Sequence, residues 1–364
     1  MGQADITLLP GLLVVFFQRR NTFNGFSNIY IYIAHTYVYF RAGFQRSLGR
    51  AESYDPTMGL SSVDRNAPSG SSVGSTDVFR SAKSSMSMDR NFSDSDLPWE
   101  KEKKFFGLVS KRKNYEKMKV HHDFDELVGE IGAEVRLIRM DYRGRGESDW
   151  DPNPLNYTPQ VESRDAVELL DHLGIEKAGI IGTSRGGMNG MFLAATAKER
   201  LLGVLLNDVG PELDREDLGT IVDFVGVNPA YPDYAAALAH YPGYCEGFAN
   251  IPTARWEVEV QRLWKEVPGG LAVRYDPELK QTVRATFEGP DVDLWPYFDA
   301  MAGLPIALLR GANSRLLTME TVANMQARRP DMLFANVPDR AHIPFLDEPE
   351  SLDALQRWLK MMVA

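Results

Sequence analysis

The chain has 364 residues, enough for one large domain with additions or for two domains. Its formal net charge of -10 at pH 7 argues against a general nucleic-acid-binding protein, because the phosphate backbone requires a basic surface. A single cysteine, Cys245, leaves no partner for an intrachain disulfide and favours a reducing compartment. On this basis we expect a cytoplasmic protein.

Residues 1–113 differ in composition from the rest of the chain. Basic residues outnumber acidic ones there, whereas acidic residues dominate after residue 113. Residues 44–97 are rich in Ser, Asp, Gly and Arg and contain few large apolar side chains. Such a segment cannot bury enough apolar surface to offset the entropy of ordering. We therefore interpret residues 1–113 as a mostly disordered N-terminal extension.

Two apolar runs in this extension, residues 8–17 and 29–40, are shorter than the roughly 20 residues that span a bilayer. The second run alternates like a strand but carries large apolar residues on both faces. A membrane-associated hairpin and a poorly ordered apolar tail both fit it, and the tail is the favoured interpretation. Membrane association is therefore not expected.

Strands and helices alternate from residue 114 onward. The pattern predicts a helix over 122–131, a strand over 134–142, a glycine turn over 143–148, a helix over 161–174, a strand over 178–182, a helix over 187–200 and a strand over 201–209. After a largely helical stretch, it predicts a strand over 305–311, a helix over 319–330, a strand over 332–338 and a helix over 351–363. This alternation favours a mostly parallel α/β sheet with right-handed crossovers. We assign residues 114–211 and 301–364 to the core and residues 212–300 to a helical lid.

The motif Gly-Thr-Ser-Arg-Gly, residues 182–186, joins the strand over 178–182 to the next helix. Gly-x-Ser-x-Gly alone is a weak signal, but a strand–turn–helix context is the one a nucleophile elbow requires. The turn exposes the Ser184 hydroxyl, and the helix N-terminus offers the Arg185 backbone N–H to a developing oxyanion. The competing interpretation is a tight turn without chemistry.

Several segments in order resemble the α/β-hydrolase superfamily, namely "DYRGRGESDW", "GTSRGG", "LLNDVGPEL", "LRGANSRLL" and "VPDRAHIPFLDEP". The resemblance covers roughly residues 115–364 and is strongest to small lidded bacterial-type serine hydrolases. It implies that His342, after the last strand, is the catalytic base. Because the elbow carries Ser, an alkyl-enzyme mechanism of the dehalogenase kind is not expected.

The chain departs from the family pattern at the third catalytic residue. Relatives usually carry the acid in the loop that here reads "RGANSRLL", where Arg315 stands at the position of the expected Asp. Some members place the acid after the strand that follows the elbow helix, and Asp208 occupies that position here. Asp208 is therefore the candidate acid, and a structural carboxylate is the alternative.

A second departure concerns the oxyanion hole. Relatives carry a His-Gly loop with preceding strands before the helix over 122–131, and neither is recognisable here. The first strands therefore look replaced by an unrelated N-terminal region, and activity is expected to be impaired.

The Arg185 side chain could meet a substrate carboxylate or pair with a lid acid, the second being favoured. Aromatic residues of the lid are expected to pack within it and in part to line an acyl pocket, namely Tyr231, Tyr234, Tyr241, Trp256 and Trp264.

These observations favour a serine hydrolase that acts on a small ester, lactone or related carbonyl compound. Two alternatives stay open: a catalytically impaired hydrolase-fold protein that binds ligands or partners, and an interaction tail with a passenger domain. No cofactor and no metal are implied, because the histidines are scattered and the pair His121 and His122 has no Cys or carboxylate at ligand spacing. The expected partner is a small-molecule substrate.

Overall fold

The computed structural model describes residues 12–13, 30–34, 124, 127, 130, 136–146 and 148–363. Within these residues the main sheet has seven strands: β1 (Leu12–Leu13), β2 (Tyr30–Ala34), β3 (Arg136–Arg139), β4 (Ala178–Thr183), β5 (Leu201–Asn207), β8 (Ile306–Gly311) and β9 (Leu333–Val337). β1 and β3 both pair with β2, and the order continues through β4, β5 and β8 to β9. Every pairing is parallel except that of β1 with β2, so the predicted α/β class is confirmed.

The strand β2 comes from the apolar run over residues 29–40. It lies between β3 and β4, and its Ala34 lies opposite Gly182. Gly182 is the first residue of the Gly-Thr-Ser-Arg-Gly motif, residues 182–186, which is called the serine turn below. The favoured interpretation of this run as an apolar tail is therefore wrong over Tyr30–Ala34. Strands of parallel sheets commonly have continuous apolar sequences, so the lack of polar alternation in this run is compatible with such a strand.

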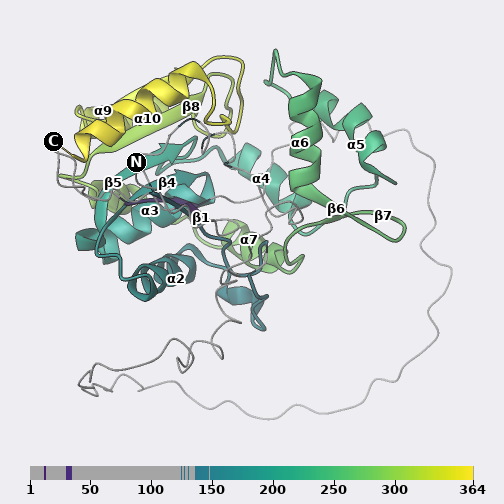
Figure 1. Cartoon of the computed structure of the whole chain (residues 1–364), viewed down its shortest axis with the longest axis horizontal. Coiled ribbons are helices and arrows are strands. Elements are labelled where there is room, and N and C mark those ends of the chain that lie inside the picture. The colour runs from purple at the N-terminus through teal and green to yellow at the C-terminus, as the bar shows by residue number, and fades with distance from the viewer. Residues whose placement is uncertain are drawn as a thin grey trace, which may run out of the picture. The chain divides into compact units, whose positions relative to one another are not determined.

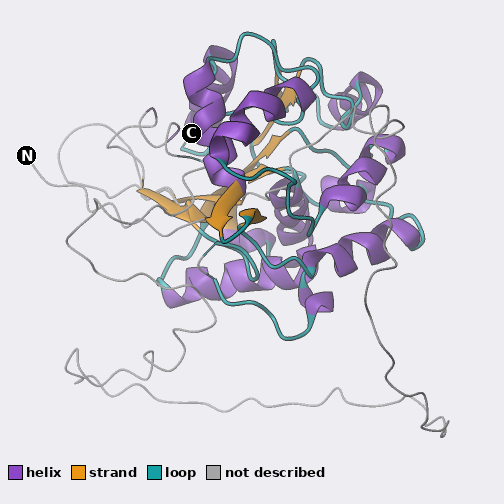
Figure 2. Ribbon diagram, turned by 90° about the vertical axis from the view of Figure 1, so that its right-hand side faces the viewer, coloured by secondary structure: helices purple, strands orange, loops and turns teal. Residues whose placement is uncertain are grey.

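Two apolar clusters lie on opposite faces of the sheet. One joins Ile180 and Val204 to helices α2, α3 and α9, and the other joins Ile181 and Leu205 to Trp358 of α10. Neighbouring strand residues enter different clusters because side chains alternate across a strand. Figure 2 shows helices on both sides of the strands. The helices of the core are α2 (Pro159–His172), α3 (Arg185–Thr196), α8 (Trp295–Asp299), α9 (Met319–Arg328) and α10 (Pro349–Met361), with short 3-10 turns at Pro154–Asn156 and Lys198–Arg200.

Between β5 and α8 the chain forms a helical layer, here called the lid, which stands beside the sheet in Figure 1. It contains α4 (Arg215–Phe224), α5 (Tyr234–His240), a 3-10 turn (Tyr241–Tyr244), α6 (Thr253–Leu263), β6 (Trp264–Val267), β7 (Gly270–Val273) and α7 (Leu279–Glu288). The hairpin β6–β7 is an addition to the largely helical lid expected from the sequence. Its two-residue turn consists of Pro268 and Gly269, and Gly269 has φ 94°, a conformation that glycine adopts readily.

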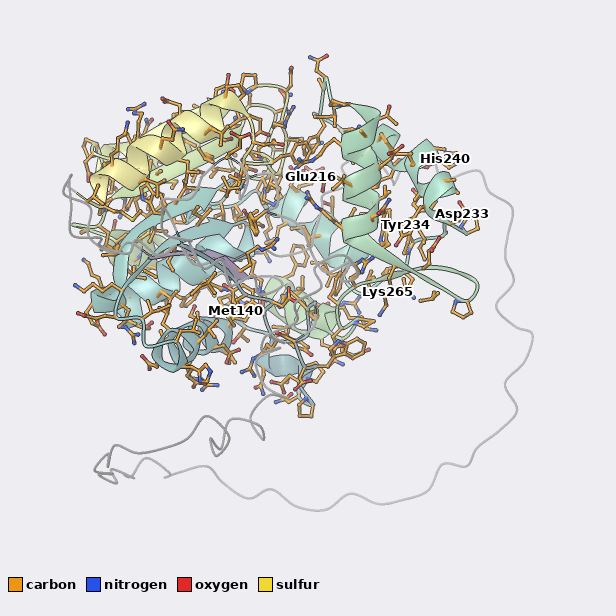
Figure 3. All side chains as sticks on the ribbon, in the orientation of Figure 1. Met140, Glu216, Asp233, Tyr234, His240 and Lys265 are labelled. Carbon is orange, nitrogen blue, oxygen red and sulfur yellow. The ribbon has the colours of Figure 1, made fainter. Side chains whose placement is uncertain are left out.

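Aromatic side chains hold the lid together. The Tyr241 ring makes edge contacts with Trp256 and Trp264, and Tyr231 makes one with Trp264. The Tyr234 hydroxyl donates to the Trp264 carbonyl at 3.0 Å, and Figure 3 labels Tyr234 on the lid, away from Met140 in the core. The expected packing of these aromatics within the lid is confirmed. Among the described residues, no helix is both long enough and apolar enough to cross a membrane.

Candidate active site

Ser184 lies between the end of β4 and the start of α3, as the motif predicted. Its backbone has φ 51° and ψ -117°, a strained conformation for a residue with a side chain. The turn brings strand and helix together so closely that a Cβ at Gly182 would lie 2.4 Å from the Gly186 carbonyl oxygen. Glycine at this position is therefore a steric requirement of the turn.

His342 follows β9 and reaches the serine turn. Its Nε2 lies 3.0 Å from the Ser184 Oγ, and its Nδ1 lies 2.6 Å from the Asp208 Oδ2. The imidazole is buried, with 4% of the residue exposed. The three residues selected from the sequence therefore form one continuous hydrogen-bonded chain, although they come from the ends of three different strands.

Asp208 follows β5 directly and is completely buried. Its Oδ1 accepts from the Gly311 backbone N–H at 2.9 Å, and its Oδ2 accepts from the Ser314 hydroxyl at 2.6 Å. Like Ser184, it has a positive φ, 54°. These two donors, together with His342, fix the carboxylate in one orientation.

Arg315, at the usual position of the family acid, takes no part in this chain of hydrogen bonds. Its side chain is more than half exposed and pairs with Asp217 of α4 at 3.2 Å. The side chain of the same loop that faces Asp208 is Ser314. The loop therefore supports the carboxylate of the neighbouring loop with a hydroxyl.

The N-terminus of α3 lies at Ser184. The Ser184 side chain does not cap this helix, and the Ser184 carbonyl accepts from the N–H groups of Gly187 and Met188. At the first position of a helix, the Arg185 N–H has no acceptor within the helix. It is available to an anion at the Ser184 hydroxyl, where the helix dipole also favours negative charge.

The Arg185 side chain does not extend to the lid. Its Nε donates to the Glu162 Oε2 at 2.8 Å, and its Nη2 donates to the Glu162 Oε1 at 3.0 Å and to the Tyr157 carbonyl. The favoured expectation for this guanidinium, a lid acid, is therefore wrong. The reason is that α2 places a buried carboxylate directly beside the first turn of α3.

Glu162 is completely buried and also accepts from Arg145 Nη1 at 3.0 Å. Burial works to raise the pKa of the Glu162 carboxyl, but the Arg185 and Arg145 guanidiniums outweigh it and hold this pKa below its usual value. Burial also lowers the pKa of Arg145. An arginine nevertheless stays charged, so the three groups form a buried ionic cluster.

Two expectations about the site lie outside the described residues. One is the loss of the second oxyanion donor in the region of residues 100–121, and the other concerns the pair His121 and His122. Among the residues that are described, no three His, Cys, Asp or Glu side chains are arranged to hold a metal ion.

The sequence profile of the alpha/beta hydrolase family matches residues 118–355. The chain belongs to the α/β hydrolase family. The 3-hydroxybutyrate-oligomer hydrolase of Cupriavidus necator is 33% identical over 239 residues, which cover 63% of this hydrolase and 81% of the relative. An esterase of Mycobacterium tuberculosis is 27% identical over 250 residues, covering 65% and 77% of the two chains. The crystal structure of an α/β hydrolase from Novosphingobium aromaticivorans matches this hydrolase with a TM-score of 0.60 at 34% identity, covering 66% and 86%.

Sequence reasoning missed two residues that the structure brings to the site. Ser314 carried no signal, because a lone serine in a loop has no pattern. Glu162 did carry one: it lies in phase with Ala166, Leu169 and Leu170, the apolar positions of α2. A charged residue on the buried face of a helix requires a partner of opposite charge, and this hydrolase supplies two.

Proposed function

We propose that this α/β hydrolase cleaves a carboxylic ester through an acyl-enzyme on Ser184. The observation that carries the proposal is the unbroken hydrogen-bonded chain from the Ser184 hydroxyl through His342 to Asp208 at the carboxyl ends of the strands. In this proposal Ser184 is the nucleophile, His342 the general base and acid, and Asp208 the acid that orients the imidazole. The Arg185 backbone N–H is an oxyanion donor.

The first half-reaction forms the acyl-enzyme. His342 Nε2 accepts the Ser184 hydroxyl proton as Oγ bonds to the ester carbonyl carbon, and the carbonyl π electrons move onto the oxygen. The Arg185 N–H and the helix dipole stabilise this oxyanion. The tetrahedral intermediate then expels the alkoxide, which takes the proton from Nε2 and leaves as an alcohol.

In the second half-reaction, water replaces the alcohol. His342 Nε2 accepts a proton from the water as the water oxygen bonds to the acyl carbon. Nε2 then returns this proton to Ser184 Oγ, and the acid product leaves. Throughout, Asp208 keeps Nδ1 protonated and stabilises the imidazolium, because its Oδ2 lies 2.6 Å from that nitrogen. No further group is needed to balance either half-reaction.

For the substrate class, we propose small esters of hydroxy acids, with lactones as related compounds. The Cupriavidus necator relative is named for the hydrolysis of 3-hydroxybutyrate oligomers and shares 33% identity with this chain. A dimer of 3-hydroxybutyrate is therefore the first natural substrate to assay, next to p-nitrophenyl acetate as a generic ester.

A fluorophosphonate probe tests the proposal, because it reacts only with an activated serine. We expect the full chain to be labelled and to hydrolyse p-nitrophenyl acetate, and Ser184→Ala to lose both properties while keeping its thermal unfolding midpoint. Full activity in folded Ser184→Ala would overturn the proposal. A folded wild-type chain that is neither labelled nor active would instead favour a binding protein of hydrolase fold.

A further inference from the structure

The carboxylate of Glu162 forms four hydrogen bonds beneath the serine turn. Its Oε1 accepts from Arg145 Nη1 and from Arg185 Nη2, both at 3.0 Å. Its Oε2 accepts from Arg185 Nε at 2.8 Å and from Asn189 Nδ2 at 3.2 Å. One fully buried side chain of α2 therefore binds two side chains of α3 and one from the loop after β3.

The two α3 side chains are four residues apart, so they lie on one face of the helix across its first turn. Arg185 directly follows Ser184, and its guanidinium binds Glu162 through two parallel N–H groups, a geometry that fixes direction as well as distance. Because the side chain and the N–H of Arg185 share one Cα, holding the guanidinium restricts the direction of that N–H.

The charge of this cluster is suited to stabilising an oxyanion near Ser184. One carboxylate and two guanidiniums leave a net charge of +1 in a buried region. Arg145 Nη2 is buried and has no hydrogen-bond acceptor among the described residues, and the guanidinium carbon lies 5.9 Å from the centre of the Tyr142 ring. A fixed positive charge at low dielectric stabilises negative charge that develops nearby.

From these contacts we propose that Glu162 is a positioning residue for ester hydrolysis. It holds Arg185 so that the backbone N–H of that residue points at the oxyanion, and it keeps the first turn of α3 in register with Ser184. The inference rests on the proposed function, because it assigns Glu162 a role in that reaction. It predicts that Glu162 acts on the transition state far more than on substrate binding.

The competing explanation is that the cluster only stabilises the core. The lid offers a matched control for it, because Glu259 of α6 is equally buried and also pairs with two arginines. Its Oε1 accepts from Arg255 Nε at 2.7 Å and from Arg262 Nη1 at 3.0 Å. Removing the charge of Glu259 therefore reproduces the loss of a buried ionic cluster without touching the serine turn.

The experiment compares Glu162→Gln, Arg185→Met, the double variant and Glu259→Gln in the full chain. Measured are kcat and KM on p-nitrophenyl acetate, the inhibition constant of a trifluoromethyl ketone that forms a tetrahedral oxyanion, and the thermal unfolding midpoint. We expect kcat of Glu162→Gln to fall about 10- to 100-fold with KM nearly unchanged, because a small misplacement of a catalytic group has effects of this size. The ketone should bind more weakly by about the same factor.

Two further results are expected, one from the coupling between Glu162 and Arg185 and one from the Glu259 control. Arg185→Met should lose about as much activity as Glu162→Gln, and the double variant no more than the worse single one, because both changes remove one interaction. Glu259→Gln should lower the unfolding midpoint comparably while kcat stays within about threefold. If folded Glu162→Gln keeps its kcat and its affinity for the ketone, the inference is overturned.

The outcomes separate this inference from the proposed function. A wild-type chain without turnover or probe labelling overturns the proposed function, and the inference falls with it. A wild-type chain that is active, with Glu162→Gln equally active, overturns the inference alone. If Glu162→Gln does not fold, Arg185→Met decides: unchanged kcat and unchanged ketone affinity in that variant overturn the inference as well.

Discussion

The loops that follow β5 and β8 leave neighbouring parallel strands at the same edge of the sheet, yet they contribute different groups to the site. The β5 loop carries the buried carboxylate of Asp208, which reaches His342. The β8 loop carries Ser314 and the Gly311 N–H, which both donate to that carboxylate, and it turns Arg315 outward to Asp217. In the proposed site the acid therefore comes from the β5 loop, and the β8 loop donates hydrogen bonds to it.

The largest expected effect follows from removing the acid of the β5 loop. Asp208→Asn keeps the shape, but the Asn NH₂ group that replaces Oδ2 cannot accept the hydrogen bond from His342 Nδ1–H, so the wrong imidazole tautomer is favoured. We expect kcat on p-nitrophenyl acetate to fall by about 10⁴, with KM little changed. Activity within tenfold of wild type in the folded variant would mean that Asp208 is only structural.

A second prediction moves the acid from one loop to the other. Asp208→Gly tolerates the positive φ at this position and opens space beside His342. Adding Ser314→Asp places a carboxylate where the Ser314 hydroxyl lies, 2.6 Å from the Oδ2 that it replaces. We expect this pair to regain about 10- to 100-fold of the kcat that Asp208→Gly loses.

The matched control is Asp208→Gly with Arg315→Asp. Because the Arg315 side chain faces α4 and solvent, this second pair should regain nothing. Rescue by Arg315→Asp, without rescue by Ser314→Asp, would show that the β8 loop changes its path when the acid is moved.

A smaller effect is expected from the hydroxyl that supports the carboxylate. Ser314→Ala removes one of the two donors from the β8 loop and leaves the Gly311 N–H in place. A hydrogen bond to a charged group contributes about 1.5–3 kcal/mol, so kcat should fall roughly 10-fold to 100-fold at most. Ser314→Thr, which keeps the hydroxyl, is the control and should retain most of the activity.

The smallest effect on catalysis is expected at Arg315. Burial raises the pKa of the Asp217 carboxyl, and the Arg315 guanidinium opposes that shift. Arg315→Ala should therefore raise this pKa further. Because the folded state then holds the Asp217 proton to higher pH than the unfolded state, stability should fall as pH rises through this range.

Thermal unfolding of Arg315→Ala at several pH values checks this. The decrease in the unfolding midpoint relative to wild type should be small, since the Arg315 side chain is more than half exposed. This decrease should be larger at pH 7 than at pH 3. On p-nitrophenyl acetate, kcat should stay within about threefold. A much larger loss of kcat would place Arg315 within the catalytic machinery and contradict the comparison of the two loops.

Local patterns were enough to predict most of the core. The strands over 178–183, 201–207 and 306–311 lie within a few residues of their predicted bounds, because buried parallel strands consist of uninterrupted apolar residues. The strand β2 was missed because β3 and β4, which pair with it in parallel, come from far along the chain. Nothing within residues 29–40 identifies β4 as a partner, and the same run would suit an apolar tail.

The sequence by itself determined the serine turn and the chain order of the proposed nucleophile, acid and histidine. A turn between a buried strand and a helix needs glycines at fixed spacing, so Gly182, Ser184 and Gly186 encode their geometry locally. Asp208 and His342 could be selected because each follows a recognisable strand, and parallel strands end at one edge of the sheet.

Only the tertiary structure decided how these residues are supported. Ser314 donates to Asp208 across 106 positions of the chain, and Glu162 binds Arg185 across 23. Which of two adjacent side chains in the β8 loop faces inward depends on the path of that loop over the neighbouring strand. Directional contacts of this kind depend on side-chain positions within a few tenths of an ångström, and only the packed sheet and its helices determine those positions.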